Sequence, residues 1–466
     1  MNVKISSNIV IENYTMKLLK WCEDNLVVEN SKYKQLKMLK KDFLIKKYHI
    51  QQFSKIYKVD ETKNTLTIPF GCLRAIWFMI KDSNMSWNFN QNHDISIKDV
   101  PCAIDLYDYQ KDAVNVMIKN KGGVLVSPCG SGKTIMGIEI VRRIGKPFIW
   151  LVHTGDLLRQ AYKDFIDLYP DMDIGLITEG DVNFGQDGVI STVQTLSSLD
   201  VKLYKDKFDV VIVDECVHAN GTGDDKKMFQ KVLDNIPARY KFGLTATPYR
   251  SDDLIKTMYS LIGTNAMGQF DCTHKVPKEL VKTIVAEHVK FELDTLINDD
   301  DFVSADHINF NNVISYLVND DDRTKTIVDN IIKCHDEGRK QVVLSGRIEH
   351  CKKINEMLTE RGIKSQIIIG ASTTKKRDSV LNEKEDWSVI ISTYSLLKEG
   401  VSIKSLDTLH LVTPIVNQSS IVQCVGRIER YKENKLQPIV YDYVDINSSY
   451  CMRCYNERER ILIERF

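Results

Sequence analysis

From about residue 105 onward, short apolar runs alternate with stretches in which apolar residues recur every three or four positions. The short runs are rich in β-branched residues, which is typical of buried parallel strands. These predicted strands cover residues 122–126, 147–152, 210–213, 340–344, 388–392, 409–412 and 438–444. The stretches between them, such as 134–144 and 350–361, predict amphipathic helices. Repeated units of this kind build doubly wound parallel sheets with helices on both faces.

Two acidic stretches, at 299–301 and 320–322, interrupt this alternation. We therefore predict two tandem doubly wound parallel-sheet lobes of the α/β class, the first over residues 105–285 and the second over 286–466. Residues 1–104 have a different pattern, in which a Lys-rich helical stretch precedes a strand-like and then an apolar segment. This part predicts a small α+β accessory domain.

Composition agrees with a globular protein, because hydrophobic residues make up 43% of the 466 residues and charged residues 27%. No apolar run approaches the roughly 20 residues of a spanning helix, and the first residues lack a signal-peptide pattern. We therefore expect no membrane association and a cytoplasmic location, in a bacterium or a phage-infected cell. Of the eleven cysteines, only Cys451 and Cys454 are closely spaced, so we expect reduced thiols rather than a zinc site.

The formal net charge is zero, but the charge is unevenly distributed. Residues 1–104 contain sixteen Lys and Arg against ten Asp and Glu. Seven of the lysines fall in one stretch opposed only by Asp42, and they are Lys32, Lys34, Lys37, Lys40, Lys41, Lys46 and Lys47. This stretch is either a phosphate-binding face or a solvated helix face.

A glycine-rich loop follows the first predicted strand and precedes a predicted helix. Its residues are Gly130, Ser131, Gly132, Lys133 and Thr134. In this arrangement backbone N–H groups surround a β-phosphate, Lys133 reaches the β and γ oxygens, and Thr134 can bind Mg²⁺. Ser127 stands where the simple pattern has its first glycine. We predict an ATP site here.

Two carboxylates, Asp214 and Glu215, end the predicted strand 210–213. The carboxyl edge of a parallel sheet is where ligands of such folds bind. Asp214 is then the candidate for holding Mg²⁺, and Glu215 the candidate for activating the attacking water.

Residues 211–220 (VIVDECVHAN) and 237–252 (PARYKFGLTATPYRSD) resemble motifs II and III of superfamily 2 helicases, and further motifs follow in the family's order over about residues 105–445. In the first lobe, the resemblance implies that Gln110 senses the adenine and that Thr245 and Thr247 couple ATP state to strand position. His218 is implied to share in this coupling. Thr154, Thr192 and Gln194 are implied to contact the nucleic-acid backbone.

In the second lobe, segments 342–351 and 391–403 resemble motifs IV and V, and 423–430 resembles motif VI. The resemblance implies nucleic-acid contacts by Ser345, Arg347 and Thr393. It also implies catalytic roles for Gln423, Arg427 and Arg430, of which the two arginines are candidate arginine fingers.

The sequence departs from the family pattern in several places. Val217 stands where a histidine is common, and Ser402 stands where motif V usually has an acidic residue. Tyr107 replaces the usual arginine of the adenine-sensing segment.

Within the superfamily, residues 243–253 (GLTATPYRSDD) and 320–331 (DDDRTKTIVDNI) resemble the XPB and UvsW-like group, which includes phage branch-migration helicases. This resemblance implies that both α/β lobes are RecA-like. That resemblance implies an ATP- and Mg²⁺-dependent DNA helicase or translocase that moves 3′ to 5′ on forked or junction DNA in recombination, repair or replication. Two alternatives stay open: an RNA-directed or transcript-releasing ATPase of the same fold, and the motor subunit of a restriction system. The sequence does not identify a protein partner.

Overall fold

The computed structural model describes residues 1–38, 40–81, 86–89, 104–128, 130–217, 224–246, 255–263, 270–271, 284–291, 303–304, 307–308, 310–370, 372, 379–380, 387–394, 403–415, 417–430, 432 and 434–465. The chain forms two compact units, and each is described by itself. The first comprises residues 1–128 and 132–275, and the second comprises 129–131 and 276–466. In the part of the chain described, no helix is long and apolar enough to cross a bilayer.

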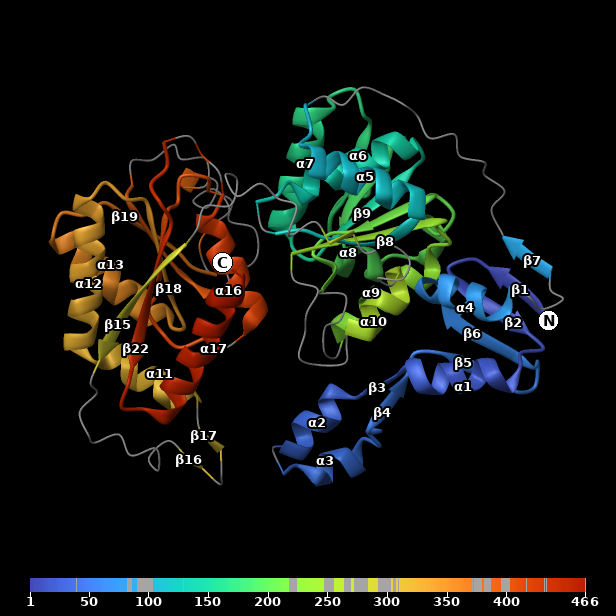
Figure 1. Ribbon diagram of the computed structural model, residues 1–466, viewed down its shortest axis with the longest axis horizontal. Helices are drawn as coiled ribbons and strands as arrows, with labels where there is room; N and C mark the ends of the chain where they lie inside the picture. The colour runs from blue at the N-terminus through green and yellow to red at the C-terminus, as the bar shows by residue number, and fades with distance from the viewer. Residues whose placement is uncertain are drawn as a thin grey trace. The chain divides into compact units, whose positions relative to one another are not determined.

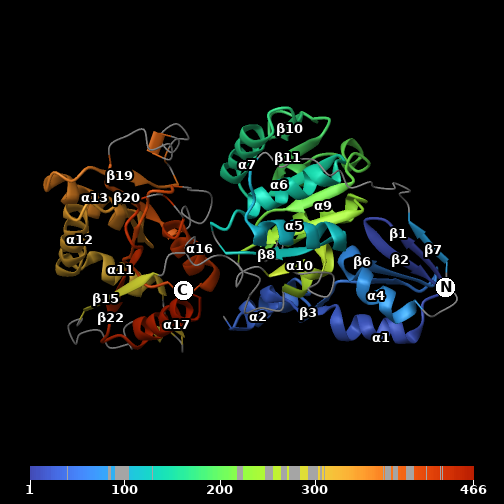
Figure 2. The same ribbon diagram turned by 45° about the horizontal axis from the view of Figure 1, so that its top comes forward.

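The first unit contains a parallel sheet of seven strands. In spatial order these are β10 (Ile174–Ile177), β11 (Gly188–Thr192), β9 (Phe148–Val152), β12 (Val210–Val213), β13 (Tyr240–Thr245), β8 (Gly122–Val126) and β14 (Phe270–Asp271). Helices cover both faces (Figures 1 and 2). They are α5 (Asp108–Asn120), α6 (Lys133–Ile144) and α7 (Gly155–Leu168), and α8 (Val193–Ser198), α9 (Asp224–Asn235) and α10 (Ile255–Ile262).

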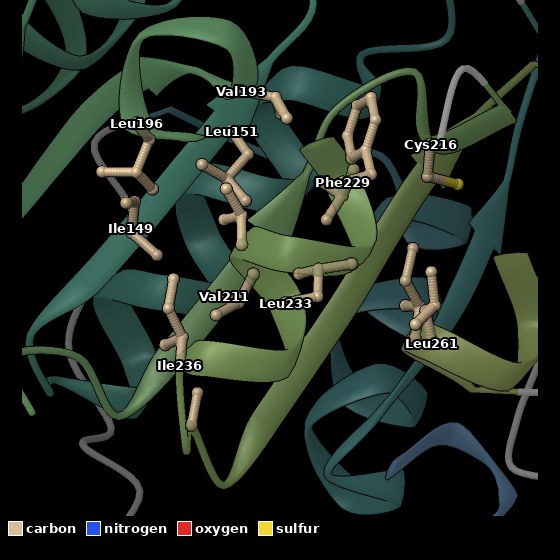
Figure 3. Close-up of a cluster of buried hydrophobic side chains, with 14 of the residues drawn as sticks. Ile149, Leu151, Val193, Leu196, Val211, Cys216, Phe229, Leu233, Ile236 and Leu261 are labelled. Carbon is tan, nitrogen blue, oxygen red and sulfur yellow. The ribbon is translucent and has the colours of Figure 1, made fainter. Parts of the chain in front are cut away.

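Figure 3 shows the core between this sheet and α8 to α10. Ile149 and Leu151 of β9 and Val211 of β12 pack against Leu233 of α9 and Leu261 of α10. Alternate residues of each strand face the same side, so this layer is apolar along every strand.

The second unit contains a parallel sheet of six strands. In spatial order these are β15 (Val285–Phe291), β22 (Ile439–Asp445), β21 (Thr408–Leu411), β18 (Gln341–Ser345), β20 (Val389–Thr393) and β19 (Ser365–Ile368). Val343 packs with α12 (Asp321–Asp336) and α13 (Ile348–Glu360) on one face, and Val342 and Leu344 pack with α16 (Gln418–Ile428) and α17 (Ser449–Arg465) on the other. Helix α11 (Phe310–Asn319) and the short pair β16 (Val303–Ser304) and β17 (His307–Ile308) precede α12. The predicted tandem α/β lobes are thus confirmed.

The amino-terminal part is a mostly antiparallel sheet of five strands with helices, as predicted. In spatial order the strands are β5 (Lys58–Asp60), β6 (Thr65–Pro69), β2 (Asn8–Glu12), β1 (Asn2–Ile5) and β7 (Ser86–Phe89). Its helices are α1 (Met16–Asn25), the short η1 (Phe70–Cys72) and α4 (Leu73–Ile80). A second strand pair, β3 (Val27–Glu29) and β4 (Phe53–Lys55), carries α2 (Ser31–Met38) and α3 (Asp42–Lys47) between its strands. We name residues 27–55 the lysine hairpin.

The five-stranded sheet packs directly on the first lobe. A Cβ on Gly71 would collide with the carbonyl oxygens of Tyr259 and Ser260 in α10, so only glycine permits this close approach. The Lys241 side chain, at the start of β13, is 1% exposed and donates hydrogen bonds to the carbonyls of Ser7 (3.2 Å) and Leu233 (2.9 Å). The accessory sheet is therefore attached to a central strand of the first lobe.

Burial lowers the pKa of Lys241 to about 8, although the Asp234 carboxylate opposes that shift. Between pH 8 and its ordinary pKa of 10.5, this lysine is neutral in the folded chain and charged in the unfolded chain. The free energy of unfolding therefore rises with pH across that window, by about 1.4 kcal/mol per pH unit, and this gain is lost as pH falls through 8.

We predict that Lys241→Met removes this slope. Raising the pH from about 7.5 to 9.5 should stabilise the wild type by roughly 2 kcal/mol relative to the variant. Thermal unfolding of both proteins at the two pH values measures the difference. Lys231→Met, which changes an exposed lysine of α9, is the matched control and should keep the wild-type slope. If the free energy of unfolding changes with pH by the same amount in the wild type and in Lys241→Met, the buried position of Lys241 is contradicted.

The described cysteines, among them Cys451 and Cys454 in α17, are free thiols and buried. Burial raises the pKa of Cys22, Cys72 and Cys351 to about 12, so these thiols stay protonated and unreactive.

Candidate functional site

The glycine-rich loop lies between β8 and α6, so the helix begins at Lys133 with its amino terminus at the loop. Gly130 and Gly132 have φ values of 79° and 83°, in the left-handed region that favours glycine. The Lys133 Nζ donates to the carbonyls of Ser127 (3.2 Å) and Pro128 (3.0 Å). The ammonium group therefore lies at the loop, where it can exchange these carbonyls for phosphate oxygens. Thr134 is the next residue of α6.

Gln110 lies beside this loop. It occupies the first turn of α5, is 5% exposed, and accepts a hydrogen bond from the Tyr107 N–H through Oε1 (3.0 Å). A Cβ added to Gly132 would lie 2.5 Å from Gln110 Nε2, so the amide fits only because residue 132 is glycine. The structure thus brings together Gln110 and Gly132, which are 22 positions apart in the sequence and which the sequence assigned to the same ATP site.

The carboxylates follow β12 at the carboxyl edge of the sheet, as predicted. Burial, together with the neighbouring Glu215 carboxylate, raises the pKa of Asp214 to about 7, although the Lys133 ammonium opposes that shift. Asp214 Oδ1 accepts from the Glu215 N–H at 3.0 Å. Glu215 has a φ of 46°, which is unusual for a side-chain-bearing residue and occurs at functional sites.

Glu215 Oε2 is buried and has no hydrogen-bond partner among the described residues. A buried oxygen of this kind costs free energy unless water or a ligand satisfies it. The donors and acceptors present therefore fit a nucleotide with a bound cation, because Lys133 supplies positive charge and Asp214 and Thr134 supply oxygen ligands.

The end of β13 contacts the loop. The Thr245 carbonyl accepts from the Ser127 N–H at 3.1 Å, so the start of motif III is bonded to the start of the phosphate loop. Thr245 is fully buried. The other two residues predicted to couple, His218 and Thr247, lie outside the described residues, as does Ser402.

Three residues predicted to contact nucleic acid lie near one another at the same sheet edge. Thr154 is the N-cap of α7 and Thr192 the N-cap of α8, where their hydroxyls accept from Leu157 N–H (3.4 Å) and Thr195 N–H (3.2 Å). The Gln194 amide lies 3.2 Å from His153 Nδ1, which joins the two segments. Helix capping is thus a role of both threonines that the sequence did not indicate.

In the second unit, Ser345 ends β18 and is fully buried, with its hydroxyl 3.0 Å from His350 Nδ1. Burial lowers the pKa of His350 to about 3, so the ring is neutral. We therefore expect Ser345 to shape the loop rather than to touch nucleic acid. The Arg347 side chain is half-buried and donates to Asn311 Oδ1 at 2.9 Å, and Thr393 ends β20.

The residues of motif VI belong to α16 and the residues after it. Gln423 and Arg427 are four positions apart on the helix and so share one face, while Arg430 follows the helix end. They lie in the second unit, and the phosphate lysine and both carboxylates lie in the first.

A buried ion pair in the second unit was missed in the sequence. Arg323 of α12 is 2% exposed and donates to both oxygens of Asp445, at 2.8 and 3.0 Å, and to the Val412 carbonyl at 2.8 Å. It ties α12 to the ends of β21 and β22. The sequence feature that could have indicated this ion pair is an arginine at an inward-facing position of an otherwise amphipathic helix.

Comparison with known proteins gives two family matches. Residues 103–250 match the family described as type III restriction enzyme, res subunit, and residues 322–432 match the helicase conserved C-terminal domain. The chain is 28% identical over 371 residues to a putative ATP-dependent RNA helicase of Acanthamoeba polyphaga mimivirus, covering 77% of this chain and 67% of that protein. It is 26% identical over 364 residues to the DNA 3′-5′ translocase XPB2 of Sulfurisphaera tokodaii, covering 71% and 80%.

Among solved structures, Dbp5 of S. cerevisiae bound to RNA and ADP BeF3 superimposes with a TM-score of 0.56 at 14% identity, covering 76% of this chain and 87% of that one. This similarity supports the fold, two tandem parallel-sheet lobes.

Proposed function

Because the chain belongs to the superfamily 2 helicases, which hydrolyse ATP in dependence on nucleic acid, we propose that it is a DNA translocase that unwinds or branch-migrates forked or junction DNA. The proposed direction is 3′ to 5′. Similarity over 71% of the chain to a protein named a DNA 3′-5′ translocase supports both DNA and the direction. The pathways proposed are recombination, repair or replication.

In the proposed mechanism, Lys133 leaves the loop carbonyls and binds the β and γ phosphate oxygens, while the glycine-rich loop supplies backbone N–H donors. Thr134 and Asp214 would hold Mg²⁺, which when bound neutralises charge on the phosphates. Glu215 accepts the proton of the attacking water through its buried, unpartnered oxygen. Gln110 would recognise the adenine, with Gly130, Ser131 and Gly132 around the phosphates.

We assign Arg427 and Arg430 the role of arginine fingers and Gln423 a supporting catalytic role, because a guanidinium stays charged and its planar fork matches phosphoryl oxygens. Thr154, Thr192, Gln194, Arg347 and Thr393 are the proposed backbone-contacting set. Contacts to the nucleic-acid backbone position the strand but do not read its base sequence. Binding should therefore be independent of sequence and sensitive to salt.

The lysine hairpin is the observation that carries the proposal of branched substrates. All seven of its lysines between residues 32 and 47 are exposed. Lys34 pairs with Glu29 at 3.3 Å and Lys37 with Asp42 at 3.2 Å, and such exposed pairs are weak enough for a phosphate to displace. The accessory sheet packs on the first lobe, so a duplex arm bound here would stay close to the motor.

We predict that changing Lys34, Lys37, Lys40 and Lys41 together to Ala reduces binding and unwinding of branched DNA. Up to about four phosphate contacts are lost, and the slope of log affinity against log salt should flatten by roughly 0.9 for each. Turnover stimulated by single strands should stay near normal. Changing Lys202, Lys205 and Lys207, lysines of the first lobe outside the hairpin, gives the matched control. If the quadruple variant binds every substrate as the wild type does at every salt concentration, the lysines are a solvated helix face and do not bind DNA.

A second candidate is an RNA-directed ATPase, which the mimivirus relative named as an RNA helicase favours. ATPase stimulation by forked DNA, four-way junctions, plain duplex and RNA hybrids separates the two. We expect the largest stimulation with branched DNA, whereas stimulation by RNA alone would replace the DNA proposal. Residues 103–250 match the restriction-enzyme subunit family, which adds a third possible outcome. In that outcome, plain duplex DNA stimulates the ATPase but its strands are not separated.

A further inference from the structure

The lysine hairpin exposes three aromatic rings. Phe43 of α3 is 66% exposed, Tyr48 at the end of α3 is 60% exposed, and Phe53 of β4 is 54% exposed. No described residue of α3 is buried. The Tyr48 N–H donates to the Leu44 carbonyl at 3.0 Å, so the Tyr48 backbone forms part of the end of α3. Single exposed apolar residues are common, but three exposed rings within eleven residues of the chain are an unusual concentration.

Lysines lie close to these rings in the sequence. Residues 40–47 contain four lysines, Lys40, Lys41, Lys46 and Lys47, against the one acid Asp42, a local charge of plus three. The Lys47 ammonium lies 5.4 Å from the centre of the Tyr48 ring. A partner must therefore be anionic and must also offer flat apolar faces. Single-stranded nucleic acid combines both, since every base has a π-face and every nucleotide a phosphate.

We propose that the lysine hairpin binds unpaired bases, with Phe43, Tyr48 and Phe53 stacking on bases and the neighbouring lysines binding their phosphates. This inference rests on the proposed function in one respect, the nucleic-acid substrate. It adds that the hairpin recognises the unpaired segment at a branch, in addition to a duplex arm. An anionic membrane is the competing partner, but the rings come from a helix, its end and a strand rather than from one face of a long amphipathic helix.

The accessory sheet places the hairpin on the same compact unit as Lys133 and the two carboxylates. In Figures 1 and 2, α2 lies beyond β3, away from the five-stranded sheet. Lys241 and Gly71 fix that sheet to β13 and α10. Bases held by the hairpin would therefore be retained next to the first lobe while the motor acts on the strand.

The test compares Phe43→Ala, Tyr48→Ala and Phe53→Ala in the full chain. Fluorescence anisotropy would report binding to a fork with unpaired arms and to a blunt duplex of equal length, each over a range of salt. We expect each substitution to weaken fork binding about tenfold, and duplex binding to change little. The salt slope should stay unchanged, because no phosphate contact is lost. In contrast, the lysine variants should flatten the slope on both substrates.

Tyr48→Phe keeps the ring and should bind the fork as the wild type does. Phe78→Ala removes an exposed ring of α4, outside the hairpin, and should have no effect. Equal losses on fork and duplex, or an equal loss from Phe78→Ala, would overturn the proposal. The proposal would also be overturned if the ring variants lost binding to vesicles of anionic phospholipid while their affinity for the fork stayed unchanged. Unfolding temperatures near that of the wild type are expected, since all the changed side chains are exposed.

Failure of this inference and failure of the proposed function give different results. If no DNA stimulates ATP turnover but the ring variants still lose fork binding, the motor assignment to DNA fails and base stacking stands. If forked DNA stimulates turnover and the ring variants bind every substrate normally, only the stacking inference fails.

Discussion

Lys133→Ala is expected to abolish ATP turnover while leaving the fold and DNA binding largely intact. The ammonium group now bonded to the Ser127 and Pro128 carbonyls is the positive charge that the β and γ phosphates require. Removing one such preorganised donor typically lowers kcat by about a hundredfold to a thousandfold. Steady-state hydrolysis with and without forked DNA measures the loss.

Lys111→Ala, a half-exposed lysine of α5 paired with Asp105 at 3.1 Å, is the matched control and should turn over normally. The unfolding temperature of Lys133→Ala should stay near that of the wild type, because the Lys133 side chain is half-buried and is not part of the apolar core. Normal stimulated turnover in Lys133→Ala would show that the glycine-rich loop is not the ATP site.

Glu215→Gln is expected to bind ATP normally but to hydrolyse ATP about a hundredfold to ten-thousandfold more slowly, the usual contribution of a general base. The amide has nearly the same shape as the carboxylate but cannot accept the proton of water. Its ATP-bound form should therefore persist, with DNA held for longer than by the wild type. Rapid-quench hydrolysis and nucleotide-binding assays separate the two effects.

Asp206→Asn changes an exposed carboxylate of the same lobe, 74% accessible, and should leave both rates unchanged. Hydrolysis at the wild-type rate by Glu215→Gln would mean that another group activates the water, and the buried Oε2 would need a different explanation.

The parallel strands that the sequence predicted are those whose side chains are buried on both faces. The run 122–126 is β8, and the runs near 148, 210, 341, 389, 408 and 439 differ from their strands by one residue at most. Such strands are continuous apolar runs, so the pattern needs no knowledge of their neighbours.

The strands that were missed contain residues whose burial depends on tertiary contacts. In β13 the charge of Lys241 interrupts the apolar run, yet the lysine is buried because Ser7 and Leu233 supply carbonyls to it. In β10 Gly175 interrupts the run, and in β11 only Val189 and Ile190 stand between Gly188 and the polar Ser191. A local pattern cannot predict a partner more than two hundred residues away.

The candidate site was predictable in its residues but not in its contacts. Loop, helix and carboxylates follow from strand order and spacing, whereas the fit of the Gln110 amide against Gly132 depends on how α5 packs on α6. The hydroxyls of Thr154 and Thr192 act as helix caps, and Ser345 is enclosed by His350, because nearby backbone and core groups compete for the same hydrogen bonds.

The most direct test of the central claim is ATP-dependent strand displacement from duplexes that carry a single-stranded tail at either the 3′ or the 5′ end, with matched RNA hybrids alongside. The account predicts displacement from 3′-tailed and forked DNA, none without ATP, and none by Lys133→Ala. Displacement from RNA hybrids alone, or from 5′-tailed DNA alone, would contradict a 3′ to 5′ DNA motor.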